Sequence, residues 1–316
     1  MVRRILSAIM GLQLLALLLF WYLAAQLFAL DVALLAALLG VLLVRLAITA
    51  SNFRLSHRAR SPLPAQHRLD WIGRLHLFFE EYGATMLASS WTMLRHRPQM
   101  HLASQPCALP VLLVHGYGCN GGYWTQLAEV LRRERVSHLA LDLEPVAADI
   151  DDFVPLLEEA AQRLLQASGA PRLVVVAHSM GGLVTRAWLR QHGAARVARV
   201  VTLGTPHHGT ALATLGVGSN ARQMRRGSEW LARLAASEDA ARRALFTSIW
   251  SHHDNIIAPQ DSSLLPGARN IEFGGIGHVA LGRHPQVQCR VLAEILAASG
   301  TAAGQCGAPD SAAALR

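Results

Sequence analysis

The chain has 316 residues, of which 52% are hydrophobic, and a formal net charge of +8. Every basic residue is an arginine, and the arginines are scattered along the whole chain. A nucleic-acid-binding surface would instead gather them on one element with aromatic residues between them, so we expect no nucleic-acid partner. The four cysteines have no CxxC spacing, which argues against a zinc motif or a redox pair.

The N-terminal region is almost wholly apolar. Residues 5–30 carry no charge, and Arg45 is the only charged residue in residues 32–50. Because about 20 apolar residues cross the roughly 30 Å of membrane hydrocarbon, the sequence predicts a membrane anchor over residues 1–50, with two transmembrane helices that turn near Asp31. Arg45 is near the end of the second stretch, from which its side chain can reach the membrane surface. A single signal anchor or a cleaved signal peptide is the alternative, but a signal peptide's apolar region is usually only about 7–15 residues long.

Arginines flank both predicted spans. Arg3 and Arg4 precede the first span, and further arginines follow the second at positions 54, 58, 60, 68 and 74. The positive-inside rule then puts both flanks in the cytoplasm, as an even number of spans requires. There the cysteines would remain free thiols, whereas a Cys289–Cys306 disulfide would fit only an exported domain.

Residues 51–105 are expected to connect the anchor to the rest of the chain. Residues 51–69 are basic and contain prolines, which indicates a linker. Asp70 is suited to cap a helix that runs to about Leu94. We expect the apolar stripe of this helix to pack into the core, with the membrane surface as the alternative. The stripe consists of Trp71, Leu75, Phe78, Phe79, Tyr82, Met86 and Trp91.

Strand-like and helical segments alternate from about residue 106 to residue 300. This alternation predicts an α/β fold, with a mostly parallel sheet covered by helices on both faces. In such sheets the chemistry lies at the carboxyl ends of the strands. The expected strands are Val111–Val114, His138–Leu143, Leu173–Ala177, Val200–Leu203, Leu245–Trp250 and Asn270–Phe273. The expected helices are Tyr123–Arg135, Ile150–Ala167, Met180–His192, Ser228–Ala236 and Pro285–Ala298.

The segment "VVVAHSMGGLV" (residues 174–184) combines a buried strand, a serine and two glycines. Ser179 falls at the turn from the strand to the next helix, which is the position of the nucleophile in Gly-x-Ser-x-Gly elbows. Residues that flank such a tight turn must be small, and Gly181 and Gly182 meet this need. Ala177 replaces the first glycine and adds only one methyl group. A serine that merely caps a helix would need neither the strand nor the glycines.

The segment "VLLVHGYG" (residues 111–118) supplies a second part of the site. A strand that ends in His115-Gly116 exposes backbone N–H groups at the edge of the sheet, where acyl transfer needs donors for an oxyanion. We expect these donors to be the backbone N–H groups of Tyr117 and Met180.

A catalytic triad also needs a base and an acid, which follow the serine in the order acid, then histidine, in this architecture. Asp254 follows one predicted strand, and His278 follows the next in a glycine-rich loop. We therefore expect Ser179, Asp254 and His278 to act together, with His278 taking the serine proton and Asp254 fixing the imidazole tautomer.

Other polar residues near this edge are weaker candidates. Asp261 lies in a polar stretch typical of a surface loop, and Asp142 precedes the serine in the chain. The histidine pairs at 207–208 and 252–253 are expected to line the site or shape its loops. A metal site among them lacks the spacing of a motif such as HExxH, so we expect no metal and no cofactor.

With these residues assembled, the chain resembles the α/β-hydrolase superfamily, and specifically bacterial triacylglycerol lipases of the Bacillus lipase A type and their Pseudomonas-like relatives. The matching stretches lie within residues 110–298: "PVLLVHGYG", "VVVAHSMGGLVTR", "VVTLGTPHHGT" and "LFTSIWSHHDNIIAPQDSSLLPGARNIEFGGIGHVAL". The resemblance assigns the same triad and the same oxyanion donors, and it makes Ala177 a family feature. It also implies an α/β-hydrolase domain over residues 106–300.

Two segments depart from this family pattern. The membrane anchor has no counterpart in the Bacillus enzymes. Residues 211–243 are longer than a minimal lipase needs, and their amphipathic piece (Met224, Trp230, Leu231 and Leu234) is expected to form a small cap, a lipid-contacting patch or a plain surface helix. Residues 301–316 are expected to be a flexible tail.

The sequence therefore predicts a lipase or esterase of the bacterial inner membrane, with its catalytic domain facing the cytoplasm and an ester or lipid as its substrate. The same triad acting on another acyl group is an alternative, as in a thioesterase, a polyhydroxyalkanoate depolymerase, a lysophospholipase or an acyltransferase. A non-catalytic hydrolase-fold scaffold is a further alternative, against which the complete set of Ser179, Asp254 and His278 argues.

Overall fold

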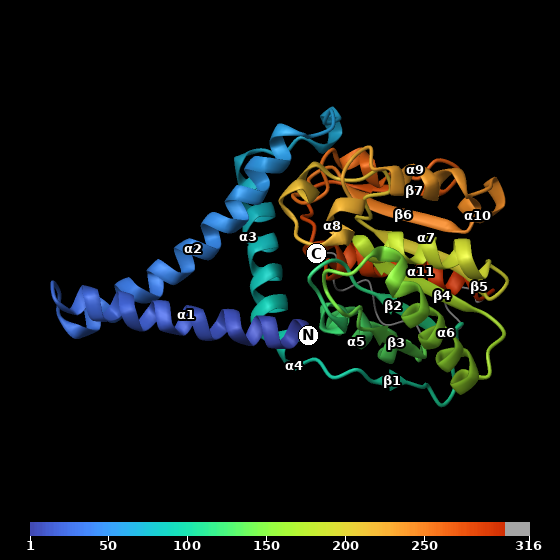
Figure 1. The fold of residues 1–316 in the computed structure, drawn as a ribbon, viewed down its shortest axis with the longest axis horizontal. Coiled ribbons are helices and arrows are strands. Elements are labelled where there is room, and N and C mark those ends of the chain that lie inside the picture. Colours follow the sequence, from blue (N-terminus) through green and yellow to red (C-terminus); the bar gives the residue numbers. More distant parts are fainter. Residues whose placement is uncertain (301–316) are drawn as a thin grey trace.

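A computed structural model describes residues 1–300 of the chain (Figure 1). Within this part, seven strands form one sheet in the order β1-β3-β2-β4-β5-β6-β7. β1 pairs with β3 in antiparallel orientation, and the other neighbouring pairs are parallel. The strands are β1 (Met100–His101), β2 (Val111–Val114), β3 (His138–Leu141), β4 (Leu173–His178), β5 (Val197–Leu203), β6 (Phe246–Ser251) and β7 (Arg269–Phe273). The six expected strands are present, and the sequence missed β1, which is too short to show a pattern.

Helices cover both faces of this sheet, which confirms the predicted α/β architecture. One apolar core joins the sheet to α6 (Val154–Ser168), α7 (Met180–His192) and α9 (Glu229–Ala236). The other joins it to α5 (Thr125–Arg133) and α11 (Pro285–Ala298). β2 and β4 are runs of apolar residues buried on both faces, which is why they occupy the centre of a parallel sheet.

The N-terminal residues form a helical hairpin that projects from the rest of the molecule (Figure 1). Helices α1 (Val2–Ala25) and α2 (Leu30–Arg58) are both long and apolar enough to cross a membrane, and only 6% and 17% of their most apolar windows are buried. Both ends of the hairpin return to the globular part. The Val2 N–H donates to Glu144 (3.1 Å), and the Ser61 N–H donates to Gln260 (3.0 Å).

The boundaries of this region differ from the predicted ones. The chain turns at residues 26–29, just before Asp31, and α2 continues through Arg58 instead of ending at residue 50. The predicted linker therefore begins only at Ala59 and includes the short 3₁₀ helix η1 (Ala65–His67). The arginine-rich composition of residues 51–58 suggested a linker, but arginine is a good helix former and extends the apolar helix without a break.

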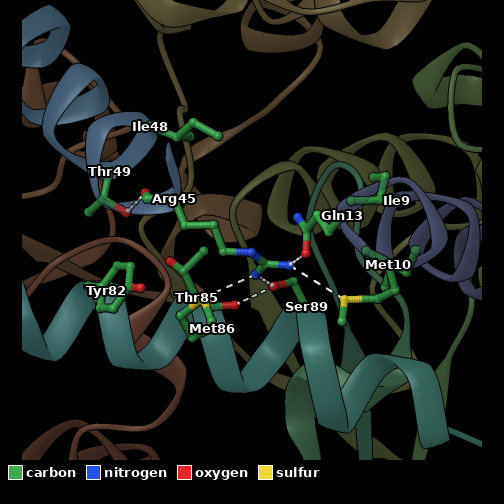
Figure 2. Close-up of a pocket in the computed structure, with 11 residues that line it drawn as sticks. Ile9, Met10, Gln13, Arg45, Ile48, Thr49, Tyr82, Thr85, Met86 and Ser89 are labelled. Atoms are coloured by element: carbon green, nitrogen blue, oxygen red, sulfur yellow. Dashed lines mark hydrogen bonds between the residues drawn. The ribbon is translucent and has the colours of Figure 1, made fainter. Parts of the chain in front are cut away.

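The Arg45 side chain, which we expected to reach the membrane surface, turns inward between three helices (Figure 2). Its guanidinium donates to Gln13 Oε1 on α1 (2.7 Å) and to Ser89 Oγ beyond α3 (3.1 Å). The thioethers of Met86 and Met10 also lie within reach. These groups line a mainly apolar cavity of about 190 Å³. A charged side chain between apolar helices is thereby given polar partners, as such positions require.

Helix α3 (Trp71–Leu87) connects the hairpin to the sheet. Asp70 caps it as predicted, accepting the Gly73 N–H at 2.7 Å. The helical path continues through a π-helical turn (Ala88–Thr92) and α4 (Met93–Arg95). The predicted burial of its aromatic stripe is wrong in part, because Trp71, Leu75, Phe79 and Trp91 are 70%, 47%, 56% and 51% exposed. The face that packs inward carries Leu77 and Ala84.

Residues 211–243 form short helices: η5 (Ala211–Leu215), α8 (Ser219–Gln223), α9 and the start of α10 (Ala240–Ala244). The lipid-patch alternative is wrong for the predicted amphipathic piece, because Met224, Trp230, Leu231 and Leu234 are buried in the core. The exposed apolar residues of this segment are instead Leu215 and Val217, and η5 contacts α2.

The remaining short elements are the 3₁₀ helices η3 (Gly121–Trp124), η4 (Ile150–Phe153), η6 (Gln260–Ser263) and η7 (Ala280–Gly282). Cys119 and Cys289 are free thiols, which argues against the Cys289–Cys306 disulfide. The expected flexible tail, residues 301–316, lies outside the described residues.

Candidate active site

Ser179 occupies the sharp turn between β4 and α7. Its backbone is in a positive-φ conformation (φ 54°, ψ −126°), which non-glycine residues rarely adopt because it is strained. Its N–H donates to the Leu203 carbonyl at the end of β5 (2.8 Å). A strained serine between a buried strand and a helix is the geometry of a nucleophile elbow.

The two glycines after Ser179 allow α7 to begin directly against the sheet. A Cβ atom on Gly181 would lie 2.5 Å from the Val114 carbonyl oxygen, and one on Gly182 would lie 2.1 Å from Thr205 Oγ1. No side chain fits in either space. Ala177 lies on the other side of the turn, where its methyl group is fully buried in the core.

Asp254 and His278 form a buried pair. Asp254 follows β6, and its Oδ2 lies 2.7 Å from Nδ1 of His278, which follows β7. The other carboxylate oxygen of Asp254 accepts the N–H groups of Ile256 and Ile257 (2.8 and 2.7 Å). Burial disfavours the charged imidazolium, but the charge and hydrogen bond of Asp254 outweigh this effect and raise the pKa of His278.

The Asp254–His278 pair lies beside the elbow. Gly204 follows Leu203, whose carbonyl accepts the Ser179 N–H. It lies so close to the pair that a Cβ atom on it would be 3.0 Å from Asp254 Oδ2 and 3.2 Å from His278 Nδ1. His178, which precedes the serine, directs Nε2 at the His278 carbonyl (3.1 Å), and the two rings are 4.5 Å apart. The structure thus brings the three predicted residues to the same edge of the sheet.

His178 was not among the sequence-based candidates. It is buried, and its ring stacks on Tyr123 at 4.3 Å. Burial, with the nearby His278, lowers the pKa of His178 well below its usual value. A neutral ring at this position supports the His278 loop without adding a charge.

Glu81 is a second functional candidate that sequence reasoning missed. It projects from α3 and is 1% exposed. Its two carboxylate oxygens accept the N–H groups of Val279 (3.0 Å) and Ala280 (2.9 Å), which directly follow His278. Burial raises the pKa of Glu81, although these two hydrogen bonds oppose the effect. A signal was present in the sequence, because Glu81 lies at helical spacing from Leu77 and Ala84 on the buried face of α3.

The expected oxyanion donors lie on two neighbouring segments. Met180 is the first residue of α7, so its N–H has no partner within the helix. Tyr117 follows β2, and its hydroxyl exchanges hydrogen bonds with the backbone of Val217 (2.8 and 3.1 Å). His115 anchors this loop by accepting the Leu143 N–H (3.0 Å), and burial lowers the pKa of His115 to about 4, which keeps the ring neutral at pH 7.

The weaker candidates have other partners. Asp142 pairs with His96 (3.2 Å) and accepts the Gly121 N–H, and Asp261 is exposed in η6. His207 is buried beside an Arg186–Glu238 ion pair, where desolvation, together with the Arg186 charge, lowers its pKa well below the usual value. His252 pairs with Glu272 at 3.0 Å.

Ser179, Asp254 and His278 are largely buried, at 7%, 2% and 4% exposed. The end of α2 and the Asp254 loop line a half-open cavity of about 90 Å³ beside Asp254.

Comparisons with known proteins agree with this fold. A family model described as "alpha/beta hydrolase fold" matches residues 110–243. The mature form of the Bacillus licheniformis lipase BlEst2 superposes with a TM-score of 0.55 at 18% identity, over 63% of this chain and 98% of the lipase. The Aspergillus fumigatus lipase B superposes with a TM-score of 0.50 at 18% identity, over 60% of this chain and 54% of that one.

Curated relatives match a smaller part of the chain. The pimeloyl-[acyl-carrier protein] methyl ester esterase of Vibrio cholerae is 35% identical over 96 residues, and that of Vibrio vulnificus is 33% identical over 107 residues. These matches cover 30% and 34% of this chain and only 36% and 40% of the relatives. With the strand order, the elbow and the family model in agreement, the chain has the α/β-hydrolase fold.

Proposed function

We propose that this protein is a membrane-anchored serine carboxylester hydrolase, a lipase or esterase. The observation that carries the proposal is the buried Asp254–His278 pair at 2.7 Å, beside a serine held at φ 54°. A serine that only caps a helix needs no strained backbone and no paired histidine. A strained backbone conformation of this kind costs of order 1–3 kcal/mol, and such conformations cluster at active sites.

In the proposed reaction, Ser179 Oγ attacks the ester carbonyl carbon and its proton passes to His278. The N–H groups of Tyr117 and Met180 donate to the oxyanion that forms. His278 then gives the proton to the departing alcohol, which leaves an acyl-enzyme. Water attacks the acyl-enzyme with His278 as its base, and this step releases the carboxylic acid and restores Ser179. No cofactor takes part.

The hairpin of α1 and α2 is the proposed anchor, in a bacterial inner membrane. Its apolar side chains are largely exposed, and a lipid environment suits such a surface better than water does. Helices α3 and η5 both contact α2. The exposed aromatic face of α3 is therefore suited to meet the membrane surface, as are the exposed Leu215 in η5 and Val217 just after it. The arginines at both ends of the hairpin favour a cytoplasmic catalytic domain.

The curated relatives favour a second candidate for the substrate. Their name describes hydrolysis of a methyl ester on an acyl chain held by a carrier protein. The same serine chemistry would then act on a methyl ester or another small acyl ester instead of a glyceride. Comparing methyl, p-nitrophenyl and glyceryl esters of increasing chain length distinguishes these substrate classes.

The experiment that tests the chemistry is Ser179→Ala in the full-length protein. Loss of a triad nucleophile is expected to lower kcat by about 10⁴–10⁶-fold in p-nitrophenyl ester hydrolysis, and to abolish labelling by a fluorophosphonate probe. Ser237→Ala, at the end of α9, is the matched control and should keep both. Wild-type activity in the Ser179→Ala variant would overturn the mechanism. An unlabelled wild-type protein would favour a non-catalytic scaffold.

A further inference from the structure

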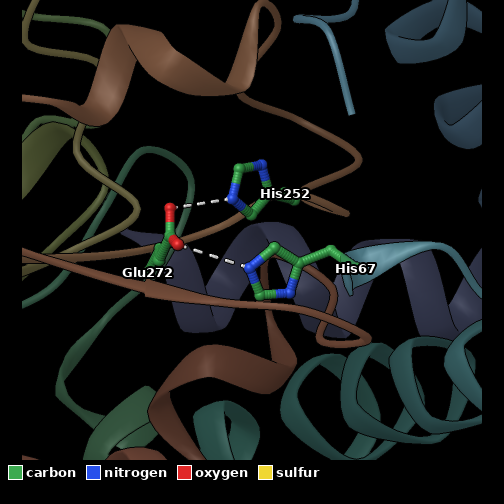
Figure 3. Close-up of side chains that lie close together, drawn as sticks. All are labelled: His67, His252 and Glu272. Carbon is green, nitrogen blue, oxygen red and sulfur yellow. Dashed lines mark hydrogen bonds and ion pairs between the residues drawn. The ribbon is translucent and has the colours of Figure 1, made fainter. Parts of the chain in front are cut away.

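Two histidines and a glutamate meet at a point away from the catalytic pair. His67 comes from η1 in the linker, His252 directly follows β6, and Glu272 comes from β7 (Figure 3). Their ligand atoms all lie within 4.8 Å of one another. Nε2 of His67 lies 3.4 Å from one carboxylate oxygen of Glu272, and Nε2 of His252 lies 3.0 Å from the other.

These distances suit a tetrahedral metal ion. Zinc binds imidazole nitrogen and carboxylate oxygen at about 2.0–2.2 Å, so two ligands of one tetrahedral zinc are about 3.3 Å apart. The two N···O separations lie on either side of this value, and they run to the two different carboxylate oxygens of Glu272, so both oxygens face the place where one ion would bind. A site of two imidazoles and one carboxylate also favours zinc and similar divalent transition metals over calcium and magnesium.

Neighbouring groups hold the two imidazoles in place before any ion binds. The ring of Trp250 packs on His252 with centroids 4.3 Å apart, and the His252 side chain is only 6% exposed. His67 stacks on His252 at 4.4 Å. Gly274 allows this approach, because a Cβ there would lie 2.6 Å from His67 Nδ1. Glu272 is 49% exposed, so an ion can reach the cluster from solvent.

We propose that His67, His252 and Glu272 bind one divalent transition metal ion of the zinc type, with water at the remaining position. The bound ion joins the linker that follows α2 to the edge strand β7. Because Asp254 lies two positions after His252, the bound ion also fixes the start of the loop that carries Asp254. The ion stabilises the junction between the hairpin and the catalytic part. This proposal does not depend on the proposed ester hydrolysis.

The test uses untagged full-length protein in detergent, stripped with a chelator and then given one equivalent of Zn²⁺. We expect about one zinc per chain after gel filtration, measured by elemental analysis. We also expect an unfolding temperature higher by about 5–10 °C when zinc is at a hundred times its Kd. Co²⁺ in place of Zn²⁺ should give the visible absorption of a tetrahedral ion.

His67→Gln, His252→Gln and Glu272→Gln should each weaken zinc binding more than about tenfold and remove the rise in unfolding temperature. His76→Gln, an exposed histidine on α3, is the matched control and should bind zinc as the wild type does. Comparison of all variants in chelator separates a folding defect from the loss of a ligand. Wild-type protein that retains no zinc, or variants that retain it unchanged, would overturn the proposal, since the three residues would then form hydrogen bonds only.

Discussion

At the scale of single residues, the Asp254 carboxylate has two separate tasks. One oxygen accepts two backbone N–H groups of its own loop, and the other faces Nδ1 of His278. The first interaction fixes the position of the carboxylate, and the second favours the imidazole tautomer whose Nε2 is free to take a proton. Because a raised pKa keeps His278 protonated to higher pH, activity should fall as the pH drops through a value above the usual pKa of histidine.

Asp254→Asn tests both tasks at once. The side-chain amide keeps an oxygen for the loop N–H groups but turns an N–H toward His278, which favours the wrong tautomer. We expect kcat to fall about 10⁴-fold. The negative charge that raises the pKa of His278 is also lost, so the acidic limb of the kcat/KM profile should move to lower pH. A profile with an unmoved acidic limb would show that Asp254 does not set the pKa of the base.

At the scale of elements, α3 links the two parts of the molecule. Its exposed face carries Trp71, Leu75 and Phe79, and its opposite face sends Glu81 under the loop of His278. We propose that Glu81 is a positioning residue, because it accepts the backbone N–H groups after His278 and its charge helps to raise the pKa of the imidazole.

Glu81→Gln should therefore alter the base without removing it. The oxygen of the glutamine amide accepts one of the two backbone N–H groups, but the other N–H then faces the amide NH₂ group. Leaving that buried donor without an acceptor costs about 1–3 kcal/mol. We expect kcat/KM to fall about tenfold and its acidic limb to move to lower pH. Glu80→Gln makes the same charge change on the same helix and should leave the pH profile unchanged. If the two variants have the same profile, Glu81 has no positioning role.

Local patterns allowed much of the site to be predicted from the sequence. Ser179, Asp254 and His278 each follow a strand of recognisable composition, and the structure has all three at the carboxyl edge of one sheet. Glu81 and His67 escaped notice because their partners lie 198 and 205 positions away in the chain. The apolar stripe of α3 was misplaced for a related reason: periodicity identifies an apolar face but does not say whether protein, lipid or water covers it.

At the scale of the whole molecule, both ends of the hairpin meet the globular part on the same side. Val2 and Ser61, which lie at or just beyond its two ends, both contact the catalytic part. An even number of spans with arginines at both ends predicts that the catalytic part faces the cytoplasm.

Reporter fusions at the C-terminus test this orientation. A fluorescent protein that matures only in the cytoplasm should be bright, and an alkaline phosphatase that needs export should be inactive. The opposite pair of results would put the catalytic part outside and would overturn the proposed location. Replacing Arg3 and Arg4 with neutral residues is expected to weaken the preference for one orientation.

The position of Glu81 also determines how far this protein can be shortened. The family model begins at residue 110, which suggests a soluble enzyme without the preceding residues. Such a truncation would leave the N–H groups of Val279 and Ala280 without their carboxylate and would strip Ala84 from the core. We therefore expect a fragment that begins near Asp70 to keep these contacts, and one that begins at residue 110 to lose them.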